Sequence, residues 1–97
     1  MTNAPIQVLI PTPLRRYTNG VARVEAQGAT VTELLNALDA EFPGLADRVR
    51  EPDGRLRRFV NVFINGENAR DRDGANSTLN PGDEVGIIPA MAGGSIR

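Results

Sequence analysis

Phe59-Val60-Asn61-Val62-Phe63-Ile64-Asn65-Gly66 carries the strongest strand signal in this 97-residue chain. The two valines and the isoleucine alternate with the two phenylalanines and Asn61, which is the period of a strand with one buried face. Asn65-Gly66 is typical of a type I′ turn, because both positions of that turn need a positive φ. The stretch therefore predicts a β-hairpin that returns through Glu67-Asn68-Ala69-Arg70.

The segment after this hairpin predicts a further strand. Asn80-Pro81-Gly82-Asp83 is typical of a tight turn, and Glu84-Val85-Gly86-Ile87-Ile88 alternates with Val85 and Ile87 inward. Pro89-Ala90-Met91-Ala92-Gly93-Gly94 then forms a tail of small residues, and Ser95-Ile96-Arg97 follows it.

The first half of the chain predicts a hairpin and one helix. Residues 6–10 alternate as a strand that Pro11 ends, and residues 21–25 read as the return strand with Ala22 and Val24 inward. Thr30 and Glu33 have the spacing of a capping box before an amphipathic helix over residues 31–42. Further core positions are expected at Leu45, Val49 and Leu79.

This order of elements predicts an α+β domain. A hairpin, a helix and three further strands in under a hundred residues favour a mixed sheet of four to five strands packed on one helix. A right-handed crossover lets the first and last strands pair as parallel central neighbours.

The composition excludes several classes of function. The net charge is -1 and the arginines are scattered among acidic residues, so we expect no nucleic-acid or membrane partner. Arg55, Arg57 and Arg58 are interpreted as a solvated loop rather than a phosphate site. No stretch approaches the roughly 20 apolar residues of a membrane span, and no secretory signal is recognisable, so we expect a cytoplasmic protein.

The chain lacks the side chains on which most enzyme mechanisms depend. Cysteine and histidine are absent, and every basic residue is arginine, so lysine is absent too. The run over residues 71–76 does not match a calcium loop, because its glycine is fourth rather than sixth. We therefore expect no bound metal, no bound cofactor and no enzymatic activity. The lack of lysine fits coding bias, or protection of an activated C-terminal acyl group from internal amines.

The element order, the 59–66 stretch, Pro81-Gly82-Asp83-Glu84-Val85 and the Gly-Gly tail together resemble the ubiquitin-like sulfur-carrier proteins. That family includes the small subunit of molybdopterin synthase and the thiamine-pathway carrier. Residues 10–15 and 57–61 look most like the carrier that feeds a cysteine synthase. The resemblance implies a ubiquitin-like β-grasp fold with a flexible C-terminal Gly-Gly tail.

The resemblance also implies a reaction at Gly94. In the family, an adenylyltransferase related to ubiquitin-activating enzymes uses ATP to adenylate the terminal glycine carboxylate, and sulfur then replaces AMP to give a thiocarboxylate. The carrier that feeds a cysteine synthase donates this sulfur to a pyridoxal-phosphate-dependent cysteine-synthase-like enzyme. Gly93 would extend the tail into narrow active sites, since glycine has no Cβ.

Ser95-Ile96-Arg97 departs from the family pattern, in which the chain ends at the second glycine. We interpret these residues as a C-terminal extension that a zinc metalloprotease of the JAMM type removes by cutting between Gly94 and Ser95. A cloning scar and an inactive carrier are the alternatives. The expected division is a β-grasp domain over residues 1–88, a tail over 89–94 and a removable extension over 95–97.

Docking of the globular body is expected to accompany insertion of the tail. Ordering residues 90–94 costs about 5–10 kcal/mol, more than the tail alone can recover. The candidate partner-binding residues are Phe59, Phe63, Ile88, Met91 and Ala92. Alternatively, the protein's own loops cover the two phenylalanines. A ubiquitin-like modifier conjugated to lysines through Gly94 and a non-catalytic binding module remain the competing functions.

Overall fold

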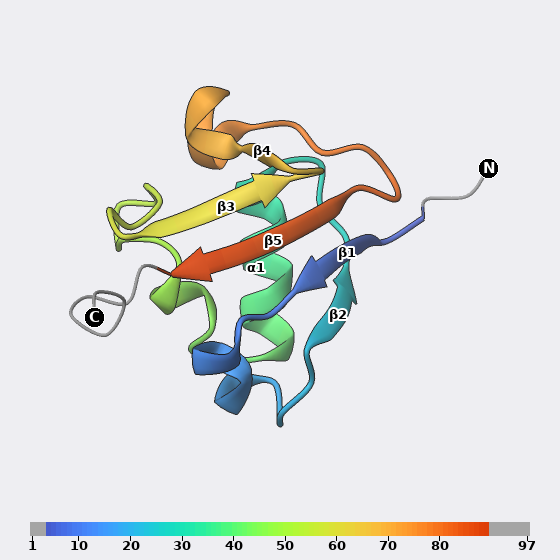
Figure 1. The fold of residues 1–97 in the computed structure, drawn as a ribbon, viewed down its shortest axis with the longest axis vertical. Coiled ribbons are helices and arrows are strands. Elements are labelled where there is room, and N and C mark those ends of the chain that lie inside the picture. Colours follow the sequence, from blue (N-terminus) through green and yellow to red (C-terminus); the bar gives the residue numbers. More distant parts are fainter. Residues whose placement is uncertain (1–3, 90–97) are drawn as a thin grey trace.

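A computed structural model describes residues 4–89. Its centre is one five-stranded mixed sheet in the order β2-β1-β5-β3-β4, with a single α-helix, α1, packed across one face (Figure 1). The strands are β1 (Ile6–Leu9), β2 (Arg23–Ala26), β3 (Val60–Ile64), β4 (Glu67–Asn68) and β5 (Glu84–Pro89), and the helix is α1 (Val31–Glu41).

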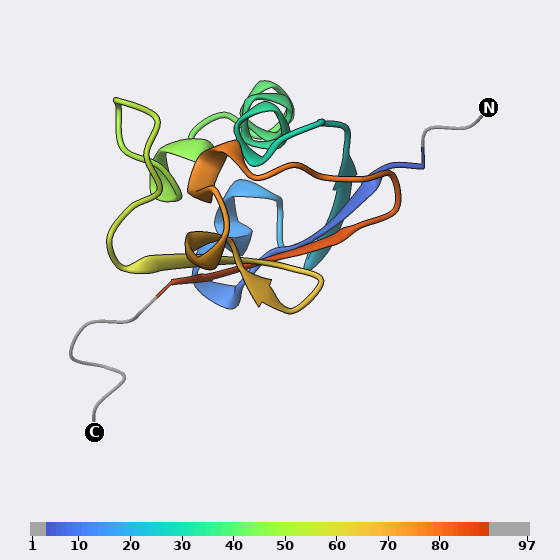
Figure 2. The same cartoon turned by 90° about the horizontal axis from the view of Figure 1, so that it is seen from above.

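The predicted topology is confirmed. β1 and β5 are parallel neighbours at the centre, with Val8 opposite Val85, and β5 is antiparallel to β3 on its other side. Figure 2 shows α1 lying over one face of this sheet. Four short 3-10 segments lie in the connections. η1 (Thr12–Tyr17) joins β1 to β2, η2 (Ala46–Arg48) lies between α1 and β3, and η3 (Ala69–Asp71) and η4 (Gly74–Asn76) follow β4.

The core lies between the sheet and α1, as the alternation predicted. Every second residue of the long strands is buried, and the helix contributes one apolar face. Leu45, Val49 and Leu79 also join this core, at 0%, 0% and 6% exposure. The most deeply buried large side chains are Ile6, Val8, Ile10, Val31, Leu34, Leu35, Leu38, Leu45, Val49, Val62, Ile64 and Val85.

The capping box at the start of α1 is confirmed, with one change. The Thr30 hydroxyl accepts from the Glu33 N–H at 3.2 Å, while the Glu33 carboxylate accepts from the N–H of Ala29 at 2.9 Å instead of from that of Thr30. The helix ends at Glu41, one residue before the predicted end, and Phe42 is its C-cap. The chain then turns at Gly44, whose φ of 96° favours glycine.

Several strand boundaries differ from the prediction. β2 begins at Arg23, so Ala22 is exposed and its expected inward position is wrong. β4 ends after Asn68, because the Asn68 side chain accepts from the N–H of Arg70 and starts the 3-10 segment η3. The type I′ turn is confirmed, with φ of 50° at Asn65 and 88° at Gly66.

No helix over residues 4–89 is long and apolar enough to cross a membrane. Within the same residues, no group of three or more acidic side chains is placed to hold a metal ion.

Candidate functional site

β5 is the strand that leads to the predicted reactive residue. It runs between β1 and β3, and its last residue, Pro89, lies opposite Val60. The predicted tail residues Met91, Ala92, Gly93 and Gly94, together with Ser95, lie outside the described residues. The structure therefore places the departure point of the tail, at the end of a central strand.

An apolar patch lies on part of the sheet face opposite α1. Leu9 and Phe63 flank Gly86 in adjacent strands, and Ile88 lies opposite Asn61 one pair further along. Directly opposite side chains on neighbouring strands have Cβ atoms about 4.5–5.5 Å apart. Ile88 is 52% exposed. We call Leu9, Phe59, Phe63, Gly86 and Ile88 the outer-face patch.

Gly86 leaves an opening in this patch. A Cβ built on Gly86 would have no heavy atom within 4 Å. The half-buried side chains of Leu9 and Phe63 stand on either side of it. A partner side chain could therefore approach the backbone of β5 here, between two apolar walls.

Phe59 is the most exposed member of the patch. It precedes β3 and is 63% exposed, while the Arg58 guanidinium lies 5.5 Å from its ring centroid. The alternative in which the protein's own loops cover both phenylalanines is therefore wrong for Phe59. Phe63 is half-buried. Phe59 is therefore a large exposed apolar side chain beside the end of β5.

Arg70, in η3, holds the segment that carries Phe59. Its guanidinium donates to the carbonyl oxygens of Arg57, Arg58 and Val60, the last at 2.7 Å, and to the Asn61 side chain at 3.3 Å. The Arg57 carbonyl also accepts from the Val60 N–H at 3.0 Å. One planar side chain thus fixes the backbone on both sides of Phe59.

Tyr17, at the end of η1, lies between two arginines. Its phenolic oxygen accepts from Arg48 Nε at 2.7 Å and from Arg16 at 3.4 Å. Both guanidinium carbons also lie near the ring, 5.3 Å (Arg16) and 5.8 Å (Arg48) from its centroid. The hydrogen bond from Arg48, followed by that from Arg16, lowers the pKa of Tyr17, because both favour the phenolate.

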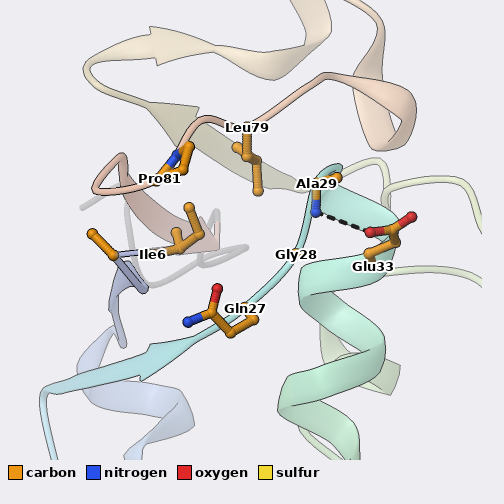
Figure 3. Close-up of a pocket in the computed structure, with 8 residues that line it drawn as sticks. Ile6, Gln27, Gly28, Ala29, Glu33, Leu79 and Pro81 are labelled. Carbon is orange, nitrogen blue, oxygen red and sulfur yellow. Dashed lines mark hydrogen bonds between the residues drawn. The ribbon is translucent and has the colours of Figure 1, made fainter. Parts of the chain in front are cut away.

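Two hollows lie elsewhere on the molecule. One, of about 470 Å³, lies between the start of α1 and the turn before β5, and Figure 3 shows Ile6, Leu79 and Pro81 on its walls. Its carboxylate, on Glu33, is bonded to Ala29 as the helix cap (Figure 3). This hollow is at the end of the sheet where β5 begins, away from the exit of the tail.

The second hollow, of about 880 Å³, is bordered by the loop over residues 51–58 and by η4. Two of its carboxylates pair with arginines of that loop, Glu51 with Arg57 at 3.2 Å and Asp53 with Arg55 at 2.8 Å. The prediction of a solvated loop is confirmed for Arg55 and Arg58, which are exposed. Arg57 is half-buried and also donates to the Asp47 carbonyl at 2.7 Å.

Four residues of the outer surface were not predicted from the sequence as part of a site. Leu9 and Gly86 could have been assigned to the patch from the sequence. Each alternates with buried residues along its strand and therefore belongs to the opposite face of the sheet. Arg70 and Tyr17 carry no local signal. Their partners are up to 13 and 31 residues away, and only the fold places them in contact.

The element order, the parallel central pair and a central strand leading to a Gly-Gly tail define a ubiquitin-like β-grasp protein of the sulfur-carrier type. The chain belongs to the ThiS family, whose model matches residues 8–94.

Similar proteins agree with this assignment. The chain is 40% identical over 91 residues to the sulfur carrier protein CysO of Mycobacterium tuberculosis, covering 92% of this chain and 98% of that protein. It also resembles the crystal structure of the Amycolatopsis orientalis BexX/CysO complex, with a TM-score of 0.87, 39% identity, and 91% and 98% coverage. A small archaeal modifier protein 3 of Haloferax volcanii is 44% identical over 66 residues, 68% of this chain and 71% of that protein.

Proposed function

We propose that this protein is a sulfur carrier whose Gly94 carboxylate is adenylated and then converted to a thiocarboxylate. The sulfur would go to the biosynthesis of cysteine or a related amino acid. The observation that carries the proposal is a Gly-Gly tail continuing from the central strand β5, in a chain that matches nearly the full length of a CysO sulfur carrier. The protein is a co-substrate of enzymes and has no catalytic role of its own.

The chemistry requires little from this chain. The Gly94 carboxylate oxygen attacks the α-phosphorus of ATP and pyrophosphate leaves; a sulfur nucleophile then attacks the acyl carbon and AMP leaves. The ionised thiocarboxylate sulfur is a nucleophile that needs no neighbouring base. The absence of histidine and cysteine throughout the chain is compatible with catalysis by the partner enzymes.

The outer-face patch is the proposed docking surface for the enzymes that receive the tail. Phe59 and Ile88 supply exposed apolar area, and Phe63 borders the opening at Gly86. Docking of this face would offset the cost of ordering the tail. Met91 and Ala92 would extend the contact toward the active site.

Three partners follow from the proposal. They are an adenylyltransferase related to ubiquitin-activating enzymes, a pyridoxal-phosphate-dependent enzyme of the cysteine-synthase type, and a JAMM-type protease that removes Ser95-Ile96-Arg97. The Amycolatopsis orientalis BexX/CysO complex supports the idea that a carrier of this fold binds a second protein. The proposed divisions are a domain over residues 1–88, a tail over 89–94 and an extension over 95–97. Pro89, the first residue of this tail, still pairs with Val60 as the last residue of β5.

The test is formation of the thiocarboxylate. The chain ending at Gly94 is incubated with its adenylyltransferase, ATP and a sulfide source, and its intact mass is measured. The expected result is a gain equal to the difference between sulfur and oxygen. The full chain is the control, since its Gly94 carbonyl is in an amide bond and should not change. An unchanged mass of the Gly94 form with every cognate enzyme would reject the proposal.

Gly94→Ala in the chain that ends at residue 94 should lower the rate of adenylation by about 100-fold or more. A methyl group at the reacting residue obstructs the close approach of phosphate. Far-ultraviolet circular dichroism should match the wild type. Adenylation at the wild-type rate would show that Gly94 is not the acceptor.

The similarity to a small archaeal modifier protein favours one second candidate, a modifier conjugated to lysines of other proteins through Gly94. Slower-migrating covalent adducts in cells, lost on deletion of Gly94, would support it. The carrier function predicts thiocarboxylate without such adducts.

A further inference from the structure

The side chains of Arg16, Tyr17 and Arg48, which we call the basic-aromatic cluster, offer donors and no spare acceptor. The phenolic oxygen accepts from both guanidinium groups, so its two lone pairs are used. Its own O–H has no acceptor among residues 4–89. A guanidinium has five N–H donors, and each arginine commits only one of them inside the cluster. Both arginines are exposed, so their remaining donors are accessible to solvent.

The positive charge of the cluster is not balanced by an ion pair. The ion pairs within residues 4–89 involve Arg23, Arg55 and Arg57. The pKa of Arg48 is raised chiefly by its hydrogen bond to Tyr17, with Asp47 contributing less and from beyond ion-pair distance. One such carboxylate does not neutralise two arginines.

The cluster lies at the end of the sheet from which the tail departs. η1 begins three residues after β1 ends, and β1 runs parallel to β5. Figure 1 shows η1 (blue) beyond the tip of the β1 arrow, on the side toward which β5 also points. Arg48, in η2, is held beside η1 by its bond to Tyr17. The cluster and the exit of the tail therefore lie at the same end of the sheet.

We propose that Arg16, Tyr17 and Arg48 bind a carboxylate side chain of the protein that receives the C-terminal tail. Two guanidinium forks and one phenolic O–H match the acceptor oxygens of an aspartate or glutamate. The contact would speed association and set the orientation of docking, which are the usual effects of charge complementarity at an interface. This inference rests on the proposed function for the identity of the partner, and on the cluster alone for the chemistry of the ligand.

The first experiment tests the ligand chemistry on the full chain by itself. The Nε–Hε NMR signals of Arg16 and Arg48 are followed during titration with a capped tetraglutamate peptide, and in a second arm with inorganic phosphate at the same ionic strength. We expect saturable shifts with the peptide and weaker ones with phosphate, while the Arg55 signal, already paired with Asp53, stays in place. Absence of shifts with the peptide, or equal shifts with phosphate, would overturn the assignment to a carboxylate.

The second experiment measures binding of the adenylyltransferase to the full chain and to its Gly94 form. The Arg16→Ala/Arg48→Ala variant should bind about tenfold more weakly at low salt, with a shallower dependence on ionic strength. Tyr17→Phe keeps the aromatic ring and both arginines, so it should lower the affinity by less than the double variant does. Arg23→Ala/Arg55→Ala is the matched control, because it also removes two positive charges and both residues form ion pairs outside the cluster.

The two experiments separate the possible failures. If the enzyme binds Arg16→Ala/Arg48→Ala as it binds the wild type, the role of the cluster in docking is rejected. If the peptide shifts the arginine signals but the wild-type chain binds no adenylyltransferase, the proposed function fails and the carboxylate site stands.

Discussion

Arg70 shows how one exposed side chain can order a docking surface. Its guanidinium reaches three carbonyl oxygens across the start of β3, on both sides of Phe59. An arginine suits this task because its donors lie in one rigid plane, whereas a lysine ammonium is a compact point charge on a flexible stem.

Arg70→Lys should therefore lower the free energy of unfolding by about 2 kcal/mol, since most of the charge-assisted hydrogen bonds are lost. Urea denaturation followed by circular dichroism measures this. Arg72 provides a matched control, because it donates to one backbone carbonyl, that of Thr78. Arg72→Lys should lower the free energy of unfolding by less than Arg70→Lys does. Equal losses would mean that Arg70 has no special role.

Tyr17 makes a second prediction testable by spectroscopy. It is the only tyrosine, and the chain has no tryptophan, so the near-ultraviolet absorbance of phenolate reports Tyr17 alone. Because Arg48 and Arg16 favour the phenolate, the titration midpoint should fall below the ordinary value of 10.0. Arg48→Ala should move it back toward that value.

The same shift has a consequence for stability. Between the lowered pKa of the folded protein and the ordinary pKa of the unfolded chain, the unfolded state binds more protons, so ionisation of Tyr17 favours folding as pH rises toward 10. The stabilisation is complete above the unfolded pKa and is lost as pH falls through the folded one. Tyr17→Phe should remove this rise, as measured by denaturation across that pH range. A rise unchanged in Tyr17→Phe would assign it to other groups.

At the scale of elements, two glycines beside strands have opposite roles. Gly28 lies against α1, where a Cβ would come within 2.6 Å of the Leu34 backbone nitrogen. Gly86 lies in β5 with open space above it. Gly28 therefore allows the close approach of the β2–α1 connection to the helix, while Gly86 shapes the outer-face patch.

Gly28→Ala should lower the free energy of unfolding by about 2 kcal/mol, because backbone has to move to admit the methyl group. Gly86→Ala should leave it unchanged or raise it by about 0.5–1 kcal/mol, since glycine weakens a strand. Thermal denaturation of the two variants provides the comparison. The reverse order would contradict the close packing of Gly28 on the helix.

At the scale of the whole molecule, the two most exposed members of the outer-face patch, Phe59 and Ile88, lie beside the end of β5 from which the tail continues. Phe59→Ser/Ile88→Ser should raise the KM of the adenylyltransferase for the Gly94 form about 10- to 100-fold, because both side chains are exposed and would be buried only on docking. The kcat and the melting temperature should change little.

Val21 is the control for this variant. It is another large exposed apolar side chain, at 46%, and it precedes β2, outside the patch. Val21→Ser should leave KM unchanged. If Val21→Ser and the double variant raise KM equally, general surface hydrophobicity rather than the patch explains binding.

Alternation and turn chemistry allowed most of the fold to be predicted. The period of two in residues 59–64, the Asn65-Gly66 turn and the Thr30 cap are local signals, and each one is confirmed. The errors occurred at the ends of elements. β4 is short because the Asn68 side chain accepts from the Arg70 N–H and starts η3. Ala22 precedes β2 and is exposed.

By itself, the sequence determined the class of this protein: the order of elements, the buried face of each strand, and a chain without histidine, cysteine or lysine whose Gly-Gly tail follows the last strand. The tertiary structure alone decided which side chains meet. Arg70 reaches the carbonyls around Phe59, Tyr17 meets Arg48 across 31 residues, and Gly86 opens between Leu9 and Phe63. Local periodicity encodes burial, whereas contacts between distant segments depend on how the whole sheet is assembled.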